Sequence, residues 1–201
     1  RRQMEYTEII RAGGWETLPG GIRSLHGARI TVLGTGDIGT EFARRAQAFR
    51  PACITGVRRT VRPSDPAFTS IHAIAELDSV LPETDLLVMA LPSTAETAGI
   101  LSRERIALLP DSAFVVNVGR GTAIDQEALC DALNAGRLAG AALDVVVPEP
   151  LPADHPLRRA KNLLLTPHVA GNMTLGYTCD KSVQMFCDDL ENYAAGRPLA
   201  H

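Results

Sequence analysis

Short apolar runs alternate with amphipathic stretches along most of the chain. The runs cover residues 30–33, 52–55, 86–90, 113–116, 141–145 and 163–165. Each run has the length of a β-strand and is apolar on both faces, which is typical of strands covered by helices on both sides. The stretches 40–49 and 125–135 carry apolar residues at helical spacing. This alternation predicts an α/β fold, a Rossmann-type doubly wound parallel sheet.

The predicted helix over 125–135 carries recognisable signals at both ends. Asp125 precedes the apolar residues Leu129 and Leu133, and Gly136 follows them. An aspartate can cap the free N–H groups at a helix start, and a glycine can adopt the left-handed conformation that ends a helix. We therefore expect Asp125 to be the N-cap and Gly136 the stop.

Two further helices, over about 2–12 and 175–195, flank the alternating region. We divide the chain into an opening helix and linker between domains (1–23), a dinucleotide-binding Rossmann domain (24–172) and a returning C-terminal helix (173–201). Because the sequence opens with Arg1 and not Met, we expect it to begin inside a longer protein. The flanking helices would then belong to, or lead into, a substrate domain that is largely missing.

Composition narrows the class of protein. Of the 201 residues, 45% are hydrophobic and 21% charged, which is close to the average for globular domains. The net charge of −3 is mild and the arginines form no stripe, so we expect neither nucleic acid nor a membrane surface as a partner. No apolar stretch is long enough to span a bilayer or resembles a signal peptide.

The cysteines indicate the redox environment. Cys53, Cys130, Cys179 and Cys187 lie on different predicted elements, without the close spacing of a zinc site. We expect free thiols, a cytoplasmic location and no metal.

A Gly-x-Gly-x-x-Gly motif directly follows the first predicted strand and opens a predicted helix. Its residues are Gly34, Thr35, Gly36, Asp37, Ile38 and Gly39. In this motif the first glycine permits a tight turn, the second lets a pyrophosphate approach the backbone, and the third allows close packing of helix on strand. The free N–H groups of the helix start attract phosphate. The context predicts a dinucleotide site that includes Gly34, Gly36, Asp37, Ile38 and Gly39.

The end of the second predicted strand bears on the choice of cofactor. Such sites usually place an acidic residue about twenty positions after the motif, where it binds the ribose hydroxyls. Here Arg58 and Arg59 occupy that region. A guanidinium can bind a 2′-phosphate through two hydrogen bonds, so we expect NADP to be preferred over NAD. The alternative is that both arginines are solvated charges at a strand end.

Three later motifs lie at the ends of predicted strands, where open α/β sheets bind their ligands. They are Asn-x-x-Arg-Gly at 117–121, Asp-Val-x-x-x-Glu-Pro at 144–150 and Thr-Pro-His at 166–168. Together with the glycine motif, and in this order, they resemble the D-isomer-specific 2-hydroxyacid dehydrogenases over essentially the whole chain. The resemblance implies an oxidoreductase that transfers hydride between NAD(P)H and a small 2-oxo or 2-hydroxy acid.

The resemblance also implies roles for the motif residues. Arg120 anchors the substrate carboxylate, His168 is the general acid and base, and Glu149 is the partner of His168. Further cofactor contacts are implied for Leu91, Pro92, Val118, Gly119, Arg120, Asp144, His168 and Gly171, with Asp144 binding the nicotinamide carboxamide. A homodimer, formed through the nucleotide-binding domain and the opening helix, is implied as well.

The sequence departs from the family in three places. Val146 replaces a common aromatic residue, and residues 172–174 replace the usual short Ser/Thr step. Most of the domain that closes over the substrate is also absent from this chain. We therefore expect the chain to bind dinucleotide but to turn over poorly, because the closing domain excludes water and fixes the substrate.

Two alternatives to this function stay open. The same family contains transcriptional corepressors, so a nucleotide-sensing binding module is one alternative, although their disordered tails have no counterpart here. The other is a related dehydrogenase for phosphoglycerate, formate or hydroxypyruvate. The sequence does not name the 2-oxo acid, because the missing domain largely sets side-chain specificity in this fold.

Overall fold

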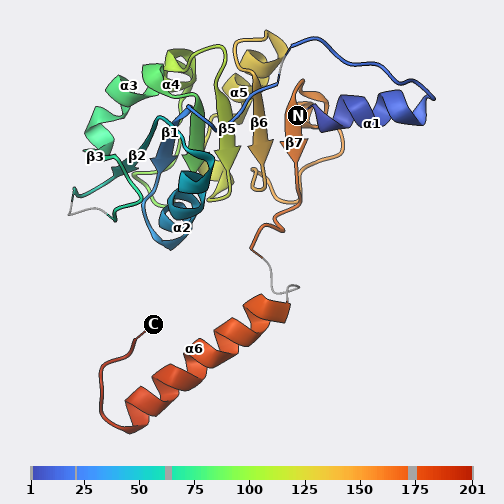
Figure 1. The fold of residues 1–201 in the computed structure, drawn as a ribbon. Coiled ribbons are helices and arrows are strands. Elements are labelled where there is room, and N and C mark those ends of the chain that lie inside the picture. The colour runs from blue at the N-terminus through green and yellow to red at the C-terminus, as the bar shows by residue number, and fades with distance from the viewer. Residues whose placement is uncertain (1, 21, 62–64, 172–175, 201) are drawn as a thin grey trace.

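The computed structural model describes residues 2–20, 22–61, 65–171 and 176–200. Within them, seven parallel strands form one sheet in the order β3-β2-β1-β4-β5-β6-β7, and the helices between the first and the last pack against it (Figure 1). The strands are β1 (Arg29–Leu33), β2 (Cys53–Arg58), β3 (Ser70–Ala73), β4 (Leu86–Met89), β5 (Phe114–Asn117), β6 (Gly140–Leu143) and β7 (Leu163–Leu165). The helices are α1 (Gln3–Arg11), α2 (Asp37–Ala46), α3 (Leu77–Val80), α4 (Arg103–Leu108), α5 (Gln126–Asn134) and α6 (Gly176–Ala194). The expected fold class is confirmed.

The strand order reverses between β1 and β4. From β1 the chain moves outward to β2 and β3, then returns to β4 and continues in the opposite direction to β7. At such a switch point the connecting loops diverge and leave a crevice beyond the carboxyl ends of the strands. The ends of β1 and β4 therefore mark the place where this fold binds a ligand.

Two hydrophobic clusters hold the helices on the sheet. Val32 and Leu33 are neighbours in β1 and point to opposite faces, and each belongs to a different cluster. The smaller cluster includes Ala43 of α2, and the larger includes Leu129 of α5. The strands between them are apolar on both faces because both faces are covered, as the sequence pattern indicated.

The local predictions have mixed outcomes. All six expected strands are present, but β3 was missed because its half-buried residues form no apolar run. Asp125 caps α5 by accepting a hydrogen bond from the N–H of Ala128 at 2.9 Å, and Gly136 has a φ of +72°. Both predicted helix ends are confirmed.

The flanking helices differ from the rest of the fold. Figure 1 shows α6 lying apart from the sheet, and none of its described residues is buried. Its exposed apolar side chains include Val183, Phe186 and Leu190. In the described part of the chain, no helix is long and apolar enough to cross a membrane. The departure predicted at residues 172–174 lies outside the described residues.

Candidate active site

The glycine motif forms the turn between β1 and α2, and each glycine has its own geometric reason. Gly34 has a φ of +100°, and a Cβ there would lie 2.6 Å from the carbonyl oxygen of Ala90 in the neighbouring connection. A Cβ on Gly39 would lie 1.9 Å from the carbonyl oxygen of Gly34. At Gly36 a Cβ would meet nothing within 4 Å. The turn is therefore closed at its first and third glycines and open at its second, where a ligand can approach the backbone.

A small hollow lies between this turn and the end of β2. It has a volume of about 230 Å³ and is lined by Thr35, Gly36, Arg58, Arg59 and Thr60. Among the described residues, the Thr35 hydroxyl is the one buried side-chain oxygen without a hydrogen-bond partner. The motif and the two arginines, which are distant in sequence, thus share one hollow that carries donors for an anion.

The two arginines differ in their partners. Arg58 is half-buried and has no side-chain hydrogen bond or ion pair among the residues that the structure describes. Arg59 is exposed, and its guanidinium lies 3.4 Å from the carboxylate of Glu96. Of the two, Arg58 is free to bind an incoming anion without first leaving a partner.

The side chain of Asn117 holds the backbone of the loop that carries Arg120. The buried Asn117 amide donates to the carbonyl of Arg120 at 2.9 Å, and its oxygen accepts from the N–H of Gly119 at 3.0 Å. A Cβ on Gly119 would lie 2.6 Å from the carbonyl oxygen of Leu91, so the loops after β4 and β5 touch. The exposed Arg120 guanidinium donates to the Gly119 carbonyl at 2.7 Å.

His168 and Glu149 come together from different loops. His168 follows β7 in a left-handed conformation with a φ of +54°, and its Nδ1 lies 2.7 Å from Glu149 Oε2. The other carboxylate oxygen of Glu149 accepts from the N–H of Val146 at 3.0 Å. The hydrogen bond from His168, assisted by that from Val146, holds the pKa of the Glu149 carboxyl below its ordinary value. A negative carboxylate therefore faces the imidazole at neutral pH.

Asp144 organises the loop on which His168 lies. Its buried carboxylate accepts from the Thr166 hydroxyl at 2.6 Å and from the N–H groups of Val169 and Ala170, both at 3.0 Å. Burial opposes ionisation, but these hydrogen bonds outweigh it and lower the pKa of Asp144. Three hydrogen bonds to the protein occupy much of this carboxylate. The predicted contact with a nicotinamide carboxamide stays a prediction.

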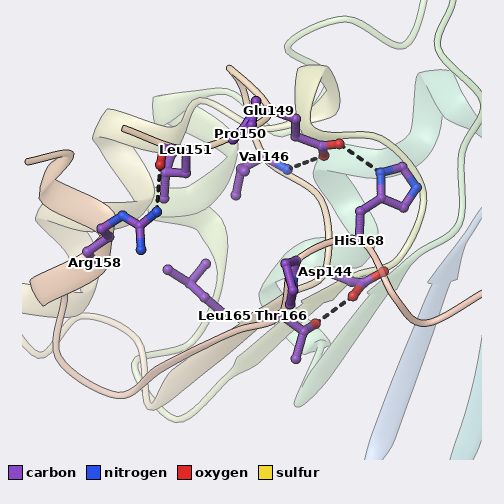
Figure 2. A pocket seen from close by; sticks show the side chains of 10 residues that line it. Asp144, Val146, Glu149, Pro150, Leu151, Arg158, Leu165, Thr166 and His168 are labelled. Carbon is purple, nitrogen blue, oxygen red and sulfur yellow. Dashed lines mark hydrogen bonds and ion pairs between the residues drawn. The ribbon is translucent and has the colours of Figure 1, made fainter. Parts of the chain in front are cut away.

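A pocket of about 610 Å³ adjoins the histidine and its partner. Figure 2 shows His168 facing Glu149 and Thr166 facing Asp144 at its border, while the guanidinium of Arg158 points toward the Leu151 carbonyl. The pocket is lined by Asp144, Val146, Glu149, Pro150, Leu151, Arg158, Leu165, Thr166, Pro167 and His168. The side chain of Val146 takes part in this lining, where the family commonly has an aromatic residue.

The structure brings the predicted site residues to one end of the sheet. Leu91 is buried and Pro92 exposed after β4, Val118 is half-buried after β5, and Ile38 is 60% exposed at the start of α2. Asp37 and Gly171 are also exposed. All of them follow the carboxyl ends of strands, as expected from the fold.

Sequence reasoning assigned no role to several residues that shape the site. Asn117 and Thr166 are the first residues of the motifs at 117–121 and 166–168. The motifs therefore indicated where these residues lie, but not which hydrogen bonds they form. Gly121 is a further case, since a Cβ there would lie 2.3 Å from the Val146 backbone. Gln126 carried no signal beyond its place at a helix start, yet its side chain contacts the loop of Glu149.

A parallel sheet in this order, with a glycine turn at its switch point, defines a Rossmann-type dinucleotide-binding fold. The family model described as D-isomer specific 2-hydroxyacid dehydrogenase, NAD binding domain, matches residues 1–170. The chain belongs to this family. The resemblance found in its motifs is thereby confirmed.

Named relatives give more detail. The chain is 38% identical over 176 residues to glyoxylate/hydroxypyruvate reductase B of Pectobacterium carotovorum, covering 84% of this chain and 53% of that protein. The chain thus spans about half the length of the curated relatives it matches.

Solved structures are similar as well. A D-isomer specific 2-hydroxyacid dehydrogenase from Xanthobacter autotrophicus, in complex with NADPH and MES, is 32% identical with a TM-score of 0.81, covering 98% of this chain and 78% of that one. An NADPH-dependent glyoxylate/hydroxypyruvate reductase from Sinorhizobium meliloti, in complex with NADP and sulfate, is 26% identical with a TM-score of 0.85, covering 100% of this chain and 62% of that one.

Proposed function

We propose that this protein is an NAD(P)H-dependent oxidoreductase that reduces a small 2-oxo acid to the 2-hydroxy acid and catalyses the reverse reaction. The observation that carries the proposal is the contact of His168 with Glu149, 2.7 Å apart, at the end of a dinucleotide-binding sheet. A histidine held by a carboxylate is the group that proton transfer to a carbonyl oxygen requires.

Each member of the proposed triad has a distinct task. With Nδ1 engaged by Glu149, Nε2 of His168 is the nitrogen that can hold the proton for the substrate carbonyl oxygen. The Glu149 carboxylate accepts the Nδ1 hydrogen bond and fixes the orientation of the imidazole ring. The Arg120 guanidinium would bind the substrate carboxylate in plane and polarise the adjacent carbonyl. A reduced nicotinamide, when bound, supplies the hydride to the carbonyl carbon.

The nucleotide site fits NADP(H) better than NAD(H). The open Gly36 leaves room for a pyrophosphate, and the hollow beside it holds the unpartnered Arg58 and the unsatisfied hydroxyl of Thr35. The described residues that line this hollow include no acidic side chain, and the nearby carboxylate of Glu96 is paired with Arg59, so Arg58 can bind a 2′-phosphate. The complexes of the similar proteins from Xanthobacter with NADPH and from Sinorhizobium with NADP support the same choice.

The similar reductases suggest glyoxylate and hydroxypyruvate as substrates to test first.

We also propose the domain division 1–23, 24–172 and 173–201, and a homodimer formed through the nucleotide-binding domain and α1. The exposed side chains of Ile10 in α1 and of Trp15 just after it support an interface there, because large apolar side chains are commonly covered by a partner. Analytical sedimentation tests the dimer, and a stable monomer at micromolar concentration would contradict it.

The test is an assay of the natural polypeptide that carries this sequence, with glyoxylate and hydroxypyruvate and with NADPH or NADH. We expect reduction of at least one substrate, and Arg120→Ala should raise KM for the 2-oxo acid as well as lower kcat. Arg103→Ala is the matched control, because it removes an arginine paired with Asp131 on the protein surface. Dinucleotide binding without turnover of any 2-oxo acid would contradict the enzyme and favour a nucleotide-sensing module.

A further inference from the structure

Gln126 makes a paired contact that the proposed triad does not use. Its Nε2 donates to the carbonyl of Val147 at 2.5 Å, and its Oε1 accepts from the N–H of Val147 at 2.8 Å. The side-chain amide thus satisfies both backbone groups of one residue, as an adjacent strand would. Val147 lies beyond β6, which ends at Leu143, and belongs to none of the strands that the structure describes.

Gln126 starts from a fixed point. It is the first residue of α5, whose start is capped by Asp125 and whose Leu129 and Leu133 are fully buried. Arg120 lies a few residues earlier, joined to α5 by the 3-10 helix Gly121–Ala123. The substrate-anchoring loop and the start of α5 are therefore parts of one continuous, packed segment.

The other end of the contact belongs to the loop after β6, which carries Glu149. Val147 lies between Val146, whose N–H donates to Glu149 at 3.0 Å, and Glu149, whose other oxygen meets His168. Gly121 also touches this loop, because its backbone packs directly on Val146. That second contact holds the loops close, but it has no donor or acceptor side chain that would fix their register.

We infer that Gln126 is a positioning residue that fixes the loop of Glu149, and through Glu149 the ring of His168, relative to the loop of Arg120. This inference rests on the roles given to those three residues in the proposed function. Catalysis of this kind needs the substrate anchor and the proton donor at a set separation, and an error of about 1 Å costs roughly 100-fold in rate. Gln126 spans the two loops that determine this separation.

The amide chemistry supplies graded variants. Glutamine offers a donor and an acceptor, glutamate at neutral pH offers acceptors alone, and alanine offers neither. Gln126→Glu keeps the bond from the Val147 N–H and loses the bond to its carbonyl. Gln126→Ala loses both bonds. Gln47→Ala is the matched control, because Gln47 also donates to a backbone carbonyl, that of Ala67 at 2.8 Å, outside this site.

The readouts are amide hydrogen exchange and the carboxyl carbon resonance of Glu149, measured by nuclear magnetic resonance on the full chain. In Gln126→Ala we expect roughly fivefold or faster exchange at Val147 and also at Val146, which Gln126 does not touch. The midpoint of the Glu149 titration should move up toward the ordinary glutamate value, because the carboxylate is no longer held against His168. Gln47→Ala should change neither signal.

Unchanged exchange at Val146 and an unchanged Glu149 titration in folded Gln126→Ala would overturn the inference. Should that variant not fold, the nearly isosteric Gln126→Glu decides, with an intermediate effect expected and no effect contradicting the role. None of these signals requires turnover, so an inactive wild type would contradict the proposed function alone. In an active enzyme, Gln126→Ala should lower kcat by ~10- to 100-fold and leave the KM for NADPH unchanged.

Discussion

The two ends of the candidate site are built in different ways. The dinucleotide end is mostly one continuous turn, from Gly34 to Gly39, joined by Arg58 and Arg59 from the end of β2. The acid–base end joins the loops after β5, β6 and β7, and each loop is linked to the next by hydrogen bonds between a side chain and backbone groups. A turn formed by consecutive residues should keep its shape when residues elsewhere are substituted. A site assembled from three loops should depend on each hydrogen bond that joins one loop to another.

The largest effect is expected from His168→Ala. Loss of a general acid should lower kcat by ~100- to 10,000-fold, while the Kd for NADPH should stay nearly unchanged because the turn at Gly36 is intact. Steady-state kinetics and fluorescence titration of NADPH measure the two quantities. His72→Ala is the control, since His72 also faces a glutamate, Glu76 at 3.4 Å, away from the site. Near-normal kcat in His168→Ala would remove it from the proposed triad.

The next effect separates the two kinds of glycine in the turn. Gly39→Ala places a methyl group against the carbonyl oxygen of Gly34 and should lower the free energy of unfolding by about 1–3 kcal/mol or more. Gly36→Ala meets open space, so it should leave the fold stable and weaken dinucleotide binding. Chemical denaturation and NADPH titration distinguish the variants. Equal stability of both would contradict the close packing at Gly39.

Cofactor preference gives the third test. Arg58→Asp should reduce kcat/KM for NADPH relative to NADH by about tenfold or more, because it replaces a charge-assisted hydrogen bond by repulsion. Arg137→Asp changes the net charge equally, at a surface site where Arg137 pairs with Asp111 at 3.2 Å, and should leave the ratio unchanged. If the wild type prefers NADH, or Arg58→Asp does not move the ratio, Arg58 is a solvated surface charge.

The smallest effect concerns the pH dependence of the acid–base end. The pKa of Glu149 is lower in the folded chain than in the unfolded one, so its contact with His168 stabilises the fold above the unfolded pKa of about 4.3. This contribution disappears as the pH falls through the folded value. Because both groups are more than a third exposed, Glu149→Gln should cost less than about 1 kcal/mol at pH 7. Urea denaturation should show that difference shrinking in acid, and a difference that grows there would contradict the assignment.

Much of the fold was predictable because its signals are local. The strands buried on both faces are apolar throughout, the glycine motif sits between strand and helix, and Asp125 and Gly136 mark the ends of α5. β3 escaped prediction because it lies at the sheet edge, where partial burial imposes no apolar run. The residues of the candidate site were found through motifs, and their placement at one end of the sheet followed from the parallel strand order.

The sequence by itself determined the α/β class, the glycine turn and which residues could carry acid, base and anion chemistry, because each depends on residue type and on neighbours in the chain. Only the tertiary structure decided which of these groups meet. Three sets of hydrogen bonds join residues far apart in sequence: Glu149 with His168, Asp144 with the loop after β7, and Gln126 with the backbone of Val147. Such contacts depend on how the loops pack at the end of the sheet. The periodicity and the motif spacing of the sequence do not indicate which side chains of different loops come within hydrogen-bond distance.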